Sequence, residues 1–176
     1  MTKGTVLFDT FMKYIFLDID GVLNNSRTKT RTPEGYVGIS DGLTKRLRRI
    51  IQTTGAAVVL TSTWETAAEG EDQLYMNRKL KRFGAKPVDK TVEPDENLFQ
   101  RGAGIREFLK VNPCDAFVIL DDFDFDFAEE RLMEHLVLTD PADGLTEEDA
   151  DRAIRILNGE LSAVDPAEDR EWGYHR

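Results

Sequence analysis

Two pairs of acidic side chains follow short apolar runs in this sequence, and their types and spacing suit metal-assisted chemistry. Asp18 and Asp20 follow the first run, and Asp121 and Asp122 follow a later one. Residues two apart on an extended chain point to the same side, so Asp18 and Asp20 can face one ligand. Neighbouring carboxylates repel one another unless a cation is present, and hard oxygen ligands suit magnesium. The pattern predicts a magnesium site.

Hydroxyl side chains end another apolar run, where Thr61 and Ser62 follow residues 56–60. If these runs are parallel strands, their carboxyl ends converge at one edge of a sheet, where ligands bind. Each acidic pair also has a purely structural interpretation, because Asp-Gly is an ordinary turn and Asp121-Asp122 can begin a loop or cap a helix. The conjunction of all three groups favours a functional site.

Elements of two kinds alternate along the chain and would position these side chains. Short apolar runs typical of strands buried on both faces lie at 14–17, 56–60, 116–120 and 135–138, with an edge strand near 85–88. Helical spacing of apolar residues predicts helices from Ser40 or Asp41 to Gly55, around Leu74 to Gly84, over Gly102 to Lys110, and from Thr146 to Gly159. The alternation predicts an α/β fold, a Rossmann-like three-layer sandwich with a mainly parallel sheet.

Length and composition set the domain organisation and exclude several chemistries. With 176 residues, the chain suits one catalytic domain, expected over 1–158, with a flexible tail at 159–176. The lone Cys114 cannot form an internal disulfide, which suits a reducing compartment. The two histidines, His135 and His175, are too few and too far apart for a zinc site or a Ser-His-Asp triad. Any hydrolysis would therefore use carboxylates.

The charge of the chain argues against a general affinity for nucleic acid, since its formal net charge is −10. A local basic cluster, Arg27, Lys29 and Arg31, nevertheless follows the first acidic pair. No apolar run approaches the roughly 18 residues that a membrane span needs, and the first dozen residues do not have the pattern of a secretory signal. We therefore expect a cytoplasmic protein without a membrane partner.

At these acidic and hydroxyl positions the sequence resembles the haloacid dehalogenase-like (HAD) superfamily. Residues 18–24 (DIDGVLN) match its first motif, 58–62 (VVLTS) resemble the second, and 118–122 (VILDD) resemble the fourth. Arg101 best matches the basic third motif, with Lys90 and Lys86 as alternatives. Residues 60–64 (LTSTW), 135–137 (HLV) and 143–146 (DGLT) resemble a narrower group, the HAD domains of Swiss-army-knife RNA-repair-like proteins.

The resemblance implies a magnesium-dependent phosphatase that works through an aspartyl-phosphate. Asp18 would be the nucleophile and Asp20 the general acid and base. Magnesium would be held by the Asp18 side chain, the Asp20 backbone carbonyl and Asp122, with Asp121 close by. Thr61 or Ser62 would donate a hydrogen bond to the phosphoryl group, and Arg101 would offset its developing charge.

Asn24, Ser62 and Arg27 are the predicted substrate-binding residues, and Asp126 is a candidate further acid. The gaps 25–40 and 65–100 are too short for a full cap domain, so the predicted site is open. The expected substrate is a phosphorylated small molecule or nucleotide. Two alternatives stay open: a nucleic-acid end as substrate, with Trp64 stacking on a base or packing in the core, and an inactive binding module. The sequence leaves the oligomeric state open.

Overall fold

A parallel sheet runs through the centre of the computed structural model, which describes residues 12–64, 70–92 and 99–160. Its five strands have the order β3-β2-β1-β4-β5, and all neighbours are parallel. The strands are β1 (Lys13–Leu17), β2 (Ala57–Leu60), β3 (Asp89–Lys90), β4 (Ala116–Asp121) and β5 (Leu136–Leu138). The three central strands are mostly apolar because helices cover both faces of the sheet.

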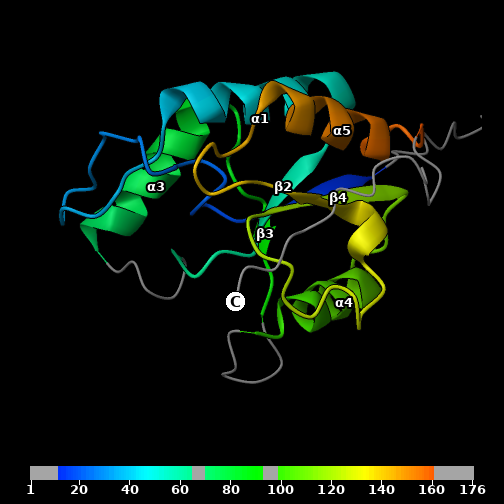
Figure 1. Ribbon diagram of the computed structural model, residues 1–176. Helices are drawn as coiled ribbons and strands as arrows, with labels where there is room; N and C mark the ends of the chain where they lie inside the picture. The colour runs from blue at the N-terminus through cyan, green and yellow to red at the C-terminus, as the bar shows by residue number, and fades with distance from the viewer. Residues whose placement is uncertain (1–11, 65–69, 93–98, 161–176) are drawn as a thin grey trace, which may run out of the picture.

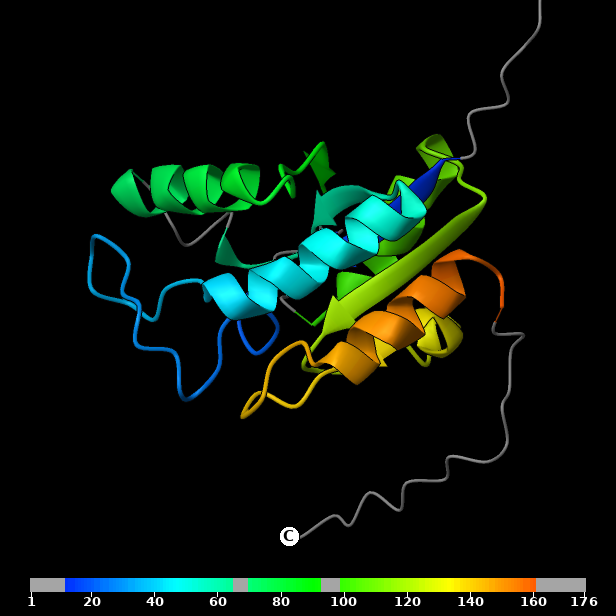
Figure 2. The same cartoon turned by 90° about the horizontal axis from the view of Figure 1, so that it is seen from above.

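Helices lie on both faces of this sheet and complete three layers (Figure 1). They are α1 (Asp41–Thr54), α3 (Glu71–Arg82), α4 (Arg101–Val111) and α5 (Glu147–Leu157), with a short 3-10 helix, η1 (Met133–His135). Apolar side chains of α1, α3 and α5 pack in one core cluster, and those of α4 pack with aromatic residues in a second. Figure 2 shows α1 and α5 side by side over the sheet. The predicted Rossmann-like α/β fold is confirmed.

The helix ends follow the predicted capping signals. The Ser40 side chain accepts the Leu43 N–H at the start of α1, and Gly55 ends that helix in the left-handed conformation, at φ 72°. Thr146 and Asp149 form a capping box at the start of α5. The positions of α1 and α5 therefore follow directly from local sequence.

Two predicted strand boundaries are wrong. The edge strand comprises Asp89–Lys90 rather than residues 85–88, because the Ala85 N–H donates to the Leu80 carbonyl at 2.9 Å and so helps to close α3. His135 belongs to η1 and not to β5, because its N–H donates to Leu132 in a tight turn. In both places, residues that were predicted to lie in a strand belong instead to a helical turn next to it.

The two segments that could carry a cap are short. Residues 25–39 form a loop with one isolated bridge, between Arg31 and Val37. The described part of the second gap holds α3 and β3, while residues 65–69 and 93–98 lie outside the described ranges. The predicted tail lies outside them as well from residue 161 onwards. Within the described residues, no helix is long and apolar enough to cross a membrane.

Candidate active site

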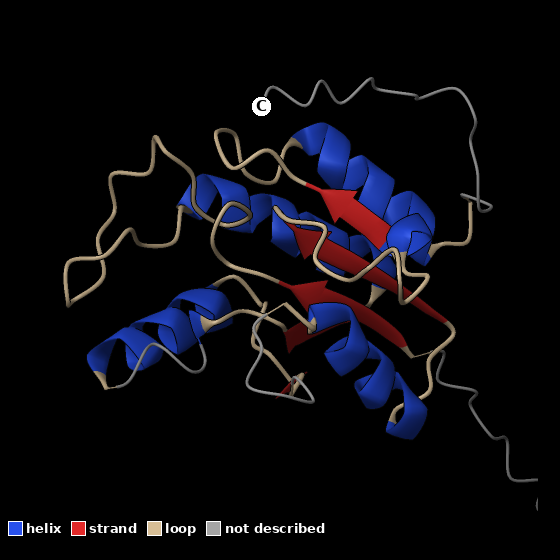
Figure 3. Ribbon diagram, turned by 60° about the horizontal axis from the view of Figure 1, so that its bottom comes forward, coloured by secondary structure: helices blue, strands red, loops and turns tan. Residues whose placement is uncertain are grey.

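The carboxyl ends of β1, β2 and β4 lie at one edge of the sheet, where all strand arrows end (Figure 3). Backbone hydrogen bonds continue the pairing just beyond the strands. The Asp18 N–H donates to the Leu120 carbonyl at 3.0 Å, and the Thr61 N–H donates to the Leu17 carbonyl at 2.9 Å. The sheet therefore brings the acidic and hydroxyl residues together, as their positions after the strands predict.

Three carboxylates gather at this edge. Each of Asp18, Asp121 and Asp122 offers an oxygen within 4.8 Å of the others. Asp18 is 5% exposed and Asp121 is fully buried, whereas Asp122 is half-buried. Gly21 makes room for this cluster, since a Cβ at that position would overlap the Asp122 carboxylate, and its φ of 67° also favours glycine.

Arg101 contributes the positive charge of the cluster. Its Nη1 lies 2.6 Å from Asp121 Oδ2 and 3.3 Å from Asp18 Oδ2, and the residue is only 3% exposed. The guanidinium also stacks on Phe125, whose ring centroid is 4.2 Å away. Phe125 adopts φ 36°, a strained conformation for this residue. The third-motif alternatives, Lys86 and Lys90, are exposed near the edge strand.

The loop after β4 also fixes the helix that carries Arg101. Asp126 accepts the Gly102 N–H at 2.6 Å and the Ala103 N–H at 3.0 Å, which satisfies two unpaired donors at the start of α4. Asp126 was predicted as a candidate further acid of the site. Its carboxylate instead caps α4, and it is not one of the three clustered acids.

Burial and mutual repulsion disturb the ionisation of these side chains. Burial, followed by the charge of Asp18, raises the pKa of Asp121 to about 7. Burial is also the main cause that raises the pKa of Asp18 and of Asp122. Burial alone would lower the pKa of Arg101. The negative charges of Asp18 and Asp121 outweigh burial and raise the pKa of the guanidinium. In the absence of a cation, the protonated forms of these carboxyl groups are therefore favoured relative to free side chains.

The cluster suits a divalent cation in both charge and ligand type. Three carboxylates carry three negative charges when ionised, and one guanidinium offsets only one of them. Their hard oxygens are the ligands that magnesium prefers. Asp121 already accepts hydrogen bonds at both oxygens, from Arg101 at 2.6 Å and from the Phe123 N–H at 3.1 Å. Asp18 and Asp122 would therefore hold the ion, with Asp121 behind them.

The Asp20 side chain lies outside this acidic cluster and is exposed. Its two oxygens accept hydrogen bonds from Trp64 Nε1 at 2.9 Å and from Asn24 Nδ2 at 2.7 Å. Asn24 Oδ1 in turn accepts the Gly21 N–H at 3.0 Å. Trp64 is buried, as the packing interpretation predicts, but no sequence pattern indicates its contact with Asp20.

The two hydroxyl residues after β2 differ in their hydrogen bonds. The Ser62 hydroxyl bonds to Asp18 and accepts the Trp64 N–H at 3.3 Å. Thr61 Oγ1 is buried and has no hydrogen-bond partner among the described residues, and the same is true of Arg101 Nε. Buried polar atoms without a partner are rare, and at this edge they suit an anionic ligand.

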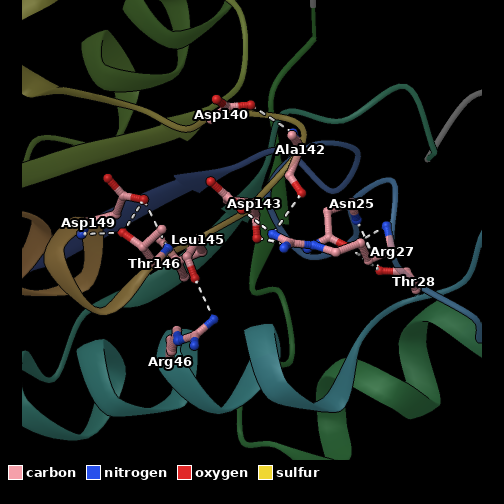
Figure 4. Close-up of polar contacts among 10 residues, drawn as sticks. All are labelled: Asn25, Arg27, Thr28, Arg46, Asp140, Ala142, Asp143, Leu145, Thr146 and Asp149. Carbon is pink, nitrogen blue, oxygen red and sulfur yellow. Dashed lines mark hydrogen bonds and ion pairs between the residues drawn. The ribbon is translucent and has the colours of Figure 1, made fainter.

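Arg27 is held by the loop that follows β5, as Figure 4 shows. It forms an ion pair with Asp143 and donates to the Ala142 carbonyl at 3.2 Å. Asn25 Nδ2 donates to the Asp143 carbonyl at 2.8 Å, so two neighbouring residues link these loops. Exposed ion pairs contribute only about 0–1 kcal/mol, so this pair holds the Arg27 side chain only weakly.

A polar hollow of about 550 Å³ adjoins the same loop. It is lined by Asn25, Arg27, Thr28, Lys29, Thr30, Ser40, Asp41, Gly42 and Lys79, and by none of the three clustered acids. Its lining carries three basic side chains and one acidic one, in a chain whose net charge is strongly negative. The hollow begins directly after Asn24, which contacts Asp20.

Comparison with known proteins agrees with this geometry. The profile of the family described as "HAD domain in Swiss Army Knife RNA repair proteins" matches residues 14–150. No curated protein matches the chain significantly. The match spans β1 to the start of α5 and so includes all the clustered acids and Arg101. The chain therefore belongs to the family of HAD domains found in Swiss Army Knife RNA repair proteins.

Proposed function

We propose that this HAD domain is a magnesium-dependent phosphatase that hydrolyses a phosphomonoester through an aspartyl-phosphate at Asp18. The observation that supports this most is the combination of three clustered carboxylates with Arg101 and the unpartnered hydroxyl of Thr61. The carboxylates suit a cation, while the guanidinium and hydroxyl suit the oxygens of a phosphoryl group. Among the described residues, no other group of three such metal-ligating side chains lies close together.

In the first step, an Asp18 carboxylate oxygen attacks phosphorus and forms a new P–O bond as the bond to the leaving oxygen breaks. The leaving oxygen keeps that electron pair and takes a proton from Asp20. Arg101 and Thr61 donate hydrogen bonds to the phosphoryl oxygens and offset the charge that develops there. A bound magnesium ion would neutralise charge on the phosphoryl group and let Asp18 approach it.

In the second step, Asp20 takes a proton from water, and the water oxygen attacks the phosphorus of the aspartyl-phosphate. The bond to Asp18 breaks, inorganic phosphate leaves, and Asp20 again carries the proton for the next cycle. An exposed carboxyl group suits this role, because it must meet both the leaving group and water. The Asp18 side chain, by contrast, is almost fully buried.

The test is hydrolysis of an aryl phosphate by the purified protein with Mg²⁺, with EDTA and as Asp18→Asn. We expect turnover with Mg²⁺ and its loss, by at least about 10³-fold, in the other two conditions, since the nucleophile and the cation act as one unit. Asp89→Asn is the matched control, because Asp89 is an exposed acid on β3. Equal turnover by Asp18→Asn and the unmodified protein would reject the mechanism.

A second candidate substrate is a nucleic-acid end, and the basic hollow beside Asn24 favours it. A strand that places its terminal phosphate at Asp18 has further phosphates to place, and Arg27 and Lys29 offer cations for them, whereas Lys79 already pairs with Asp41. The family description also names RNA repair proteins. We expect oligonucleotides to inhibit aryl phosphate turnover, with inhibition that weakens steeply as salt rises. Inhibition that is independent of salt would favour a small metabolite.

A further inference from the structure

Trp64 is buried by packing, yet its one polar atom reaches the exposed carboxylate of Asp20. We propose that Trp64 is a positioning residue that holds Asp20 in the orientation in which it protonates the leaving oxygen, an inference that rests on the proposed phosphatase function. The indole Nε1 donates to Asp20 Oδ2 at 2.9 Å, across 44 positions of sequence. Trp64 itself is 8% exposed, so its surroundings fix the ring.

The count of hydrogen-bonding positions on Asp20 supports this role. A carboxylate has about four lone-pair positions, and Trp64 and Asn24 each occupy one, on different oxygens. Both oxygens are thus held, while one position on each stays available for the catalytic proton and the substrate. The indole N–H only donates, so Trp64 cannot itself take up the proton. It orients Asp20 without competing for its chemistry.

The same short segment also connects the acid to the nucleophile. The Trp64 backbone N–H donates to the Ser62 hydroxyl at 3.3 Å, and the Ser62 hydroxyl bonds to Asp18. Residues 62–64 therefore contact both carboxylates, one through Ser62 and the other through the indole. In the transfer step, Asp18 and the leaving oxygen lie on opposite sides of phosphorus, so their spacing matters. A segment that contacts both can set that spacing.

A simpler interpretation is that the indole N–H only needs a partner because the ring is buried. The two interpretations differ in what the loss of the N–H does to different substrates. A leaving group that departs readily as an anion, such as p-nitrophenolate, needs little protonation. Phenolate and alkoxide groups need it far more. A misplaced acid therefore slows poor leaving groups selectively, whereas general loosening of the fold slows all substrates alike.

The experiment compares kcat/KM for p-nitrophenyl phosphate and phenyl phosphate in Trp64→Phe, which removes the N–H and keeps an aromatic ring. General acid catalysis contributes about 10²–10⁴-fold, so we expect kcat/KM for phenyl phosphate to fall at least about tenfold more than that for p-nitrophenyl phosphate. Asp20→Asn should change the ratio in the same direction. Tyr75→Phe is the control, because it removes the hydroxyl that accepts the Ile39 N–H and should leave the ratio unchanged.

Equal losses on both substrates in Trp64→Phe, or no loss, would overturn the inference while leaving the proposed function intact. Turnover that persists in Asp18→Asn would instead reject the proposed function. A second measurement covers a variant that folds poorly: the indole N–H resonance of Trp64 in otherwise unmodified protein, assigned with Trp172→Phe. We expect Asp20→Ala to shift that resonance clearly. An unchanged resonance would show that the contact does not form and would also overturn the inference.

Discussion

Replacing Asp121 by asparagine removes one negative charge from the acidic cluster and keeps a side chain of nearly the same shape. Burial and the charge of Asp18 raise the pKa of Asp121 from 3.8 to about 7, so the folded chain holds a proton there that the unfolded chain releases. Between these two pKa values the folded state binds more protons. Without a metal ion, the free energy of unfolding should therefore fall as pH rises through this range.

The size of this effect follows from the same shift. A difference of about three pKa units corresponds to about 4 kcal/mol, since each unit is worth about 1.4 kcal/mol. In a domain of this length, that is a fall in melting temperature of about 10 °C. This stabilisation of the folded state by the Asp121 proton is fully present below about pH 4. It is lost above about pH 7, where the folded chain also releases the proton. Asp121→Asn has no proton to lose, so its stability should lack this component.

The assay is urea unfolding of both proteins in EDTA from pH 5 to pH 8, with the difference between the two curves as the result. Other acids cancel in that difference. Asp41→Asn is a control that should show no pH dependence in this range, because a hydrogen bond from Lys79 lowers the pKa of Asp41 below its ordinary value of 3.8. Parallel curves for Asp121→Asn and unmodified protein would refute the reasoning. Relative stability that rises with pH would mean that the Arg101 ion pair outweighs burial.

Three further outcomes follow from single contacts in the site. Thr61→Val should raise the Ki of inorganic phosphate about tenfold without lowering thermal stability, because Thr61 Oγ1 has no partner to lose; a clear fall in melting temperature would show that it has one. Asp126→Ala should lower the free energy of unfolding in urea by about 1 kcal/mol and should also lower kcat, because Asp126 caps the helix that carries Arg101. An unchanged kcat would show that the cap does not affect how Arg101 is placed. Arg101→Met should lower the free energy of unfolding in EDTA by about 3–5 kcal/mol, and Mg²⁺ should restore part of this loss. An equal loss with and without Mg²⁺ would contradict the idea that Arg101 and the cation both offset the charge of the carboxylates.

The sequence was sufficient to predict where the acidic residues lie, because their positions follow from the strands. Asp18 and Asp121 end apolar runs whose burial on both faces dictates a parallel sheet, and parallel strands align their carboxyl ends. The helices α1 and α5 were equally predictable from the Ser40 cap and the Thr146 capping box. In these places local preference and tertiary structure agree.

The contacts that the sequence did not predict join residues far apart along the chain. Trp64 follows β2 and Asp20 follows β1, and nothing in the spacing of either residue indicates the other. Asp126 was only a candidate further acid on the family resemblance, and its carboxylate accepts hydrogen bonds from the open donors at the start of α4. The edge strand was misplaced because its pairing with β2 begins only after Ala85 has closed α3.

The close approach of Gly21 and Asp122 has a consequence for comparison between related chains. The Asp122 carboxylate occupies the space that any side chain at position 21 would need. A substitution at Gly21 therefore forces the Asp122 side chain to move, and the φ of 67° disfavours other residues there even without Asp122. Relatives that keep Asp122 should therefore also keep this glycine. A sequence that has lost its glycine here would mark a domain in which the arrangement of the acidic cluster has also changed, even where Asp18 is still present.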